Sequence, residues 1–138
     1  MVSDRGVNVV RMVDANGNIS RVAGNHGAGG FGGDGGSATA VSVAQIHDPF
    51  GLAPTPDGGF LIADSANNRI RKFFVGGNID TVAGVTTPCD VTTNPCGDGD
   101  AAINAQLNLP QGVVSRPDGR RGTREHAPGQ PTSGPRAP

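Results

Sequence analysis

Short apolar runs separated by turn residues extend along most of the chain, and the clearest series lies within residues 50–84. The apolar and alternating runs there are Phe50–Ala53, Phe60–Ala63, Arg69–Phe74 and Ile79–Val82. In the third run, Ile70 and Phe73 are set against the polar Arg71 and Lys72. The turns between them are Pro56-Asp57-Gly58, Asp64–Asn68 and Gly76-Gly77. Runs of four to six residues with such turns predict a four-stranded antiparallel meander.

The N-terminal segment repeats part of this series. Residues 1–24 match residues 61–84 at a shift of 60, with identical or similar residues at five places. The matches are Asp4 with Asp64, Asn8 with Asn68, Val10-Arg11 with Ile70-Arg71, Gly17-Asn18-Ile19 with Gly77-Asn78-Ile79, and Val22-Ala23-Gly24 with Val82-Ala83-Gly84. The pattern predicts two antiparallel strands that are joined at Asn16-Gly17. An internal repeat of this length is typical of repeat arrays, in which neighbouring units share a core.

Two longer loops also repeat. Residues 25–49 form a Gly-rich loop in which Ser37 caps a short helical turn through Ala44 and Gln45, before Pro49 stops it. Residues 85–110 contain the same pattern, with Gly97-Asp98-Gly99 on Gly33-Asp34-Gly35. Residues 111–119 repeat the first strand of the complete unit. The sequence thus divides into half a unit (1–24), a loop (25–49), a complete unit (50–84), a second loop (85–110), one further strand (111–119) and a tail (120–138).

The tail breaks the pattern. Its apolar side chains are Ala127 and Ala137, and it carries four Arg and one Glu. Such a segment buries too little apolar surface to offset its chain entropy, so we expect disorder. A basic tail that binds nucleic acid is the alternative interpretation.

Composition supports a turn-rich all-β fold. The 138 residues include 23 Gly and 11 Pro, five Phe and no Trp or Tyr. A formal charge of −1 gives the whole chain no electrostatic footprint for nucleic acid or an anionic membrane. No apolar run approaches the roughly 18 residues of a membrane helix, and the N-terminus shows no secretion signal.

Cys89 and Cys96 enclose a short loop, CDVTTNPC. A disulfide there is the favoured interpretation and would indicate a location outside the cytoplasm. Two free thiols are the alternative. Zinc would need two further ligands, and the three His show no suitable spacing.

Other candidate sites have structural interpretations. GAGGFG at 27–32 fits a dinucleotide fingerprint, but the second loop lacks these glycines and no βαβ unit surrounds them. Asp34, Asp98 and Asp100 suggest calcium, yet the ligand spacing is incomplete. We expect turn geometry at the two Gly-Asp-Gly sites and a helix N-cap at Asp100. No catalytic, cofactor or metal site is predicted.

The polar set Asp64, Arg69 and Arg71 is also interpreted as structural. Asp64 ends a strand, where its side chain can accept bonds from the N–H groups of the following turn, and Asp4 repeats it. Arg69 and Arg71 lie on one face of a strand. Positions that recur in successive units serve the unit, whereas catalysis needs something unique.

The motifs together resemble the NHL-repeat family of β-propellers, in its bacterial long-loop variety. The resemblance covers residues 1–119 and lies in Ala63-Asp64, Asn67–Arg71, Gly77, Thr81–Gly84 and both Gly-Asp-Gly loops. It implies four-stranded blades closed into a ring, of which this chain would hold an incomplete part. Open blade edges would favour self-association.

Three functions are open at this stage. The first is a non-enzymatic, extracellular or cell-surface scaffold that binds a protein or a small ligand. The second is part of a propeller enzyme, because some NHL-type propellers resemble metal-dependent lyases or lactonases. The third, RNA binding, is disfavoured by the neutral charge and scarce aromatics. No His recurs at equivalent positions, which also disfavours the enzyme.

Overall fold

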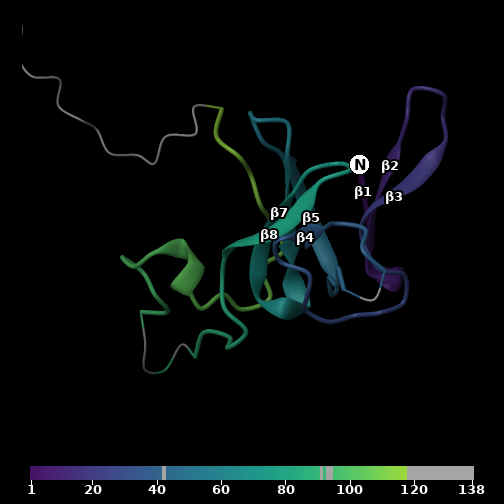
Figure 1. The fold of residues 1–138 in the computed structure, drawn as a ribbon. Helices are drawn as coiled ribbons and strands as arrows, with labels where there is room; N and C mark the ends of the chain where they lie inside the picture. Colours follow the sequence, from purple (N-terminus) through teal and green to yellow (C-terminus); the bar gives the residue numbers. More distant parts are fainter. Residues whose placement is uncertain (42, 91, 93–94, 118–138) are drawn as a thin grey trace, which may run out of the picture.

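The computed structural model describes residues 1–41, 43–90, 92 and 95–117. These residues form an all-β fold with two antiparallel sheets, shown in Figure 1. The smaller sheet has the order β1-β2-β3, with β1 at Val2–Asp4, β2 at Val9–Val13 and β3 at Ile19–Gly24. A one-turn 3₁₀ helix, η1 (Arg5–Val7), joins β1 to β2.

The larger sheet has five strands in the order β4-β8-β7-β6-β5. Its meander is β5 (Pro49–Pro54), β6 (Phe60–Asp64), β7 (Arg69–Phe73) and β8 (Asn78–Ala83), with the 3₁₀ helix η2 (Ser65–Asn67) between β6 and β7. The fifth strand, β4 (Gly36–Ser37), comes from the loop before the meander and pairs with the outer edge of β8. The loop between the two units therefore completes the sheet of the second.

The two units adopt the same conformation at the predicted shift of 60. Both the β2–β3 and β7–β8 ladders contain a bulge, after Val10 in the first and after Ile70 in the second. Beyond it, Arg11 faces Arg21 as Arg71 faces Thr81. The Asn that ends each 3₁₀ turn, Asn8 or Asn68, has left-handed backbone angles, which Asn tolerates better than most residues. The repeat predicted from the sequence is confirmed in three dimensions.

One apolar core joins the two sheets and the loop. The first unit contributes Val10, Val22 and Ala23, the loop contributes Ala38 and Ile46, and the second unit contributes Ile62, Phe73 and Ile79. Phe60 stacks on Phe73 with ring centroids 5.6 Å apart. Because neither unit encloses this core alone, the units and the loop stabilise one another, as in repeat proteins generally.

Several local predictions differ from the structure. No helix is assigned among the described residues of 25–49; Ser37 lies in β4, and the Ala44 N–H donates to the Ala40 carbonyl in a single turn. In the second loop a 3₁₀ helix, η3 (Ala102–Asn104), begins two residues after Asp100, and its N-cap is Ala101 without a side-chain bond.

The described part of the expected further strand, residues 111–117, is irregular. A ladder needs a partner, and the residues expected to pair with it lie outside the described residues, as does the whole tail 120–138. The side chain of Arg71, predicted to lie on the polar face, is fully buried, as described next.

Candidate functional site

The guanidinium of Arg71 is held by the loop that precedes its own unit. Nη1 donates to the Gln45 carbonyl at 2.7 Å, and Nη2 donates to the Gly32 carbonyl at 2.8 Å and to the Asp34 carboxylate at 2.6 Å. The Arg71 side chain is 0% exposed. Its Nε finds no partner among the described residues. A buried arginine is stable only when its charge and donors are matched, so this contact fixes the loop on the second sheet. We call it the Arg71 latch: Arg71, Gly32, Asp34 and Gln45.

Asp64 lies behind the latch and is also fully buried. It accepts hydrogen bonds from the His47 backbone N–H at 2.7 Å and from the Asn67 amide at 2.9 Å, and its Oδ2 lies 3.7 Å from Arg71 Nη1. Burial raises the pKa of Asp64, against the opposing effect of these hydrogen bonds and of Arg71. Asp64 was predicted to cap the next turn, but no cap bond forms; its carboxylate binds the distant loop instead.

Phe31 covers the outer side of this cluster. The Arg69 guanidinium carbon lies 3.7 Å from the centre of the Phe31 ring, and that of Arg71 lies 5.1 Å from it. Arg69 also donates to the Asn67 carbonyl and to the Thr86 hydroxyl, at 3.2 and 3.0 Å. Cation–π contacts of this kind keep a guanidinium stacked over an aromatic ring.

A shallow hollow of about 240 Å³ opens beside Phe31. Its lining consists of Phe31, Asp34, Arg69, Thr81, Gly84, Val85 and Ile103. The Thr81 hydroxyl is buried there without a hydrogen-bond partner in the described part of the chain. Buried hydroxyls are normally bonded. This oxygen is covered by neighbouring atoms, so a molecule in the hollow can bond it only where the wall moves aside.

The two asparagines with left-handed backbone hold the ends of the two loops. Asn8 Oδ1 accepts the Asp48 N–H at 2.9 Å, and Asn68 Oδ1 accepts the Leu109 N–H at 3.0 Å. Asp48 and Leu109 each precede a proline and have positive φ. The equivalence of the units thus extends to their loops.

Gly84 occupies a position that only glycine fits. Its φ is +96°, and an added Cβ would lie 2.9 Å from the Arg69 Cα and closer still to the Asn68 carbonyl oxygen. Gly24 repeats the geometry, with φ of +84° and the Asn8 carbonyl oxygen at 2.5 Å from such a Cβ. The positive φ and this close backbone contact explain why the repeat motif has a glycine at position 84.

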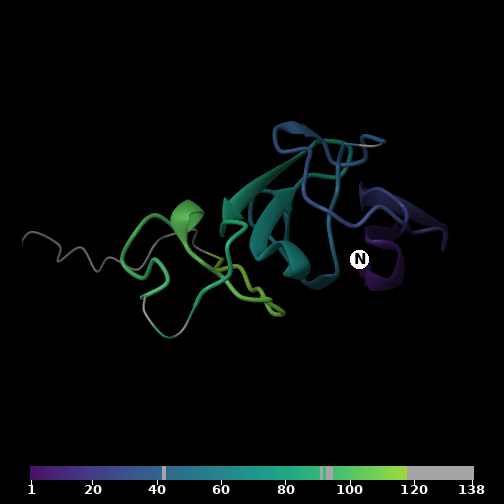
Figure 2. The ribbon, with the colours of Figure 1, turned by 90° about the horizontal axis from the view of Figure 1, so that it is seen from below.

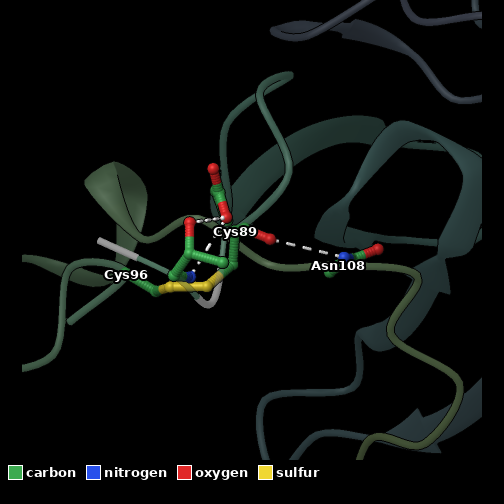
Figure 3. The surroundings of a disulfide bond; sticks show 5 residues. Cys89, Cys96 and Asn108 are labelled. Carbon is green, nitrogen blue, oxygen red and sulfur yellow. Dashed lines mark hydrogen bonds between the residues drawn. A yellow bond between two sulfur atoms is a disulfide. The ribbon is translucent and has the colours of Figure 1, made fainter. Parts of the chain in front are cut away.

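Cys89 and Cys96 form a disulfide in the second loop, with their Cα atoms 5.3 Å apart. As Figure 3 shows, Asn108 lies beside the bridge and its amide donates to the Cys89 carbonyl at 3.4 Å. The bridge lies in a different part of the structure from the Arg71 latch. Cys96 also precedes Gly97-Asp98-Gly99, so the bridge constrains the start of that turn.

Replacement of both cysteines by serine tests how much this bridge contributes. The chain-entropy model assigns about 2.5 kcal/mol to closing a loop of this length. We expect the double variant to lose about that much free energy of unfolding in urea, and the dithiothreitol-reduced native chain to lose the same. An unchanged unfolding curve on reduction would show that the bridge does not constrain the unfolded chain.

The structure separates the predicted site residues into two groups. Asp34, Asp64, Arg69 and Arg71 meet around Phe31, and Asn68 and Gly84 adjoin them. Asp98 and the disulfide lie on the second loop, where the Asp98 side chain is exposed. Among the described residues, no group of three or more His, Cys, Asp or Glu side chains could hold a metal ion. Phe31 and Thr81 were not predicted as site residues, because Phe31 was interpreted as part of the Gly-rich loop and Thr81 as part of the repeat motif.

No protein-family model matches the chain, and no curated protein is significantly similar to it in sequence. Two solved structures from Bacteroides thetaiotaomicron are similar in fold. A protein of unknown function matches with a TM-score of 0.61 and 21% identity over 81% of this chain and 26% of its own. An auxiliary nutrient binding protein matches with a TM-score of 0.52 and 25% identity over 78% of this chain and 28% of its own. The chain therefore spans about a quarter of the length of each.

Proposed function

We propose that the chain is part of a non-enzymatic NHL-type β-propeller that binds a small ligand. Two equivalent strand units sixty residues apart, joined by a loop that completes the second sheet, support a ring of blades. The similarity to an auxiliary nutrient binding protein supports a binding role within a larger protein.

The hollow beside Phe31 carries this proposal. It combines an aromatic surface, the unpartnered Thr81 hydroxyl and the Asp34 carboxylate, whose side chain is 37% exposed although it also binds Arg71. An apolar wall with a few placed polar groups is typical of small-molecule sites. Since the Asp34 carboxylate and the Arg69 guanidinium both line the hollow, its charges balance. The ligand class that fits is therefore a small neutral molecule rich in hydroxyl groups, such as a monosaccharide.

The Cys89–Cys96 disulfide supports a location outside the cytoplasm, because such bridges persist in oxidising compartments. The nutrient-binding relative is compatible with that location. Among the residues that the structure describes, no helix is long and apolar enough to cross a membrane.

Calorimetric titration of the chain with a panel of neutral monosaccharides tests the proposal. We expect saturable binding that weakens about tenfold in Thr81→Val, which removes the free hydroxyl but keeps the shape. The matched control is Thr87→Val, since Thr87 is exposed and does not line the hollow. Absence of binding to every sugar, or an equal effect of the two variants, would argue against the hollow as a ligand site.

A further inference from the structure

The β1–β3 sheet lacks the covering segments that complete the larger sheet. In the larger sheet, β4 pairs with β8 at Ile79, which is 0% exposed; its counterpart Ile19 is 49% exposed. The latched Arg71 is 0% exposed, whereas the side chain of its counterpart Arg11 is 34% exposed. Arg11 reaches only Asp4, at 3.4 Å, and its Nε is buried without a partner among the described residues. The first unit thus has the counterpart of Arg71, but the described part of the chain holds no loop that receives its side chain.

The second loop has the acidic residue of such a contact but lacks the arginine. It is anchored to the preceding unit like the first loop, because the Gly84 N–H donates to the Ala102 carbonyl as that of Gly24 does to Ala38. Gly97 and Gly33 make the same close approach, to the Cα atoms of Ala105 and Ala44. Yet Asp98, the counterpart of Asp34, makes no side-chain hydrogen bond or ion pair with the described part of the chain. This loop offers a carboxylate for an arginine that the described chain does not supply.

Within the part of the chain that the structure describes, residues 111–117 likewise lack a neighbouring strand of the kind that their counterpart in the complete unit pairs with. They correspond to β5, in which Ala53 is 6% exposed against β6; the counterpart Val114 is 85% exposed. On the other side, β1 is an edge strand of its sheet, and its Val2 is 46% exposed. An exposed edge of this kind is a template for pairing with another strand.

The two incomplete surfaces lie on opposite sides of the molecule. Figures 1 and 2 both show the five-stranded sheet between the β1–β3 sheet and the loop of residues 85–110. The loop therefore cannot cover β1–β3 of its own chain. It can do so only on another molecule, and such a head-to-tail contact is heterologous, so it can continue into a ring or a filament.

We propose that residues 96–117 of one copy complete the β1–β3 sheet of a second copy. Residues 99–101 add to the outer edge of β3 as β4 adds to β8, and residues 111–117 add to β1 as β5 adds to β6. Arg11 of the second copy binds Asp98 of the first, as Arg71 binds Asp34 within the chain. The partner is another copy because each surface has its complement, with matching charge, on this same chain. Strand addition supplies backbone hydrogen bonds, and the Arg11–Asp98 pair fixes the register.

Sedimentation velocity of the 138-residue chain over a range of concentrations tests this assembly. We expect concentration-dependent association, weakened at least about tenfold in Arg11→Asp and in Asp98→Arg, because each places like charges together. The double variant, with the charges exchanged, should associate again. Asp90→Arg is the control, since it makes the same charge change in the same loop but outside both added segments.

Mixing the two single variants gives the sharpest result. Each contact between the two variants joins opposite charges, because the native Asp98 of one meets the native Arg11 of the other and the two substituted positions are also oppositely charged. The mixture should therefore associate with the two variants alternating in a 1:1 ratio, although neither associates alone. Circular dichroism of each variant establishes that it is folded. A chain that remains monomeric up to about 1 mM would overturn the proposal, as would folded variants that associate like the native chain or a mixture that does not associate.

Discussion

Substitution of Arg71 by methionine should destabilise the chain by about 3–5 kcal/mol, because it leaves Asp34, Asp64 and two loop carbonyls without their common donor. That loss approaches the whole stability of a small domain. The measurement is urea unfolding followed by circular dichroism, at a concentration at which the chain is monomeric. Arg71→Lys should be intermediate, since lysine keeps the charge but cannot direct two nitrogens to three acceptors.

The repeat supplies a matched control for this experiment. Arg11→Met removes the equivalent arginine from the first unit, where its side chain is a third exposed and touches only Asp4. A partly exposed ion pair of this kind contributes under about 1 kcal/mol. Equal effects of Arg71→Met and Arg11→Met would contradict the assignment of the Arg71 latch as the contact that fixes the loop.

Gly84→Ala should cost about 2–5 kcal/mol. The backbone at Gly84 has a φ of +96°, which costs an alanine roughly 1–2 kcal/mol. In addition, the new Cβ would overlap the Asn68 carbonyl oxygen, and both groups lie just beyond the end of the β7–β8 ladder, where Ile70 pairs with Ala83. Thermal and urea unfolding of the variant measure the sum of the two effects.

Gly76→Ala separates the strain from the overlap. Gly76 has a positive φ of +72°, but an added Cβ would meet nothing within 4 Å. It should therefore show the conformational cost alone, about 1–2 kcal/mol. If Gly84→Ala proved no more damaging than Gly76→Ala, the close approach of Gly84 to Asn68 would not be a constraint on the sequence.

The repeat could be predicted from the sequence because its signals are local. Turn residues such as Asn16-Gly17 and Gly76-Gly77, set between short apolar runs, indicate hairpins without knowledge of distant contacts. In the structure, the positions that match at a shift of 60 carry the same bulge and the same left-handed Asn in both units, although neither feature was predicted. The disulfide was favoured for a similar reason, since its two cysteines lie seven positions apart.

The latch could not be predicted in the same way. Asp34 and Arg71 were both recognised, but as separate turn and strand residues, because they lie 37 positions apart and their contact depends on how the loop folds back. The burial of Arg71 reverses the usual preference of charged side chains for the surface. Only the packed loop shows that its carbonyls and Asp34 compensate for that burial.

Amide hydrogen exchange of the native chain, resolved by residue, tests most directly whether the loop of one unit completes the sheet of the next. The Gly35 N–H donates to the Ile79 carbonyl and the Ala38 N–H to the Gly77 carbonyl. If the loop and the sheet form one cooperative unit, these two amides exchange as slowly as those between β7 and β8. Exchange of Gly35 and Ala38 at the rate of an open chain, while β7 and β8 stay protected, would contradict this account.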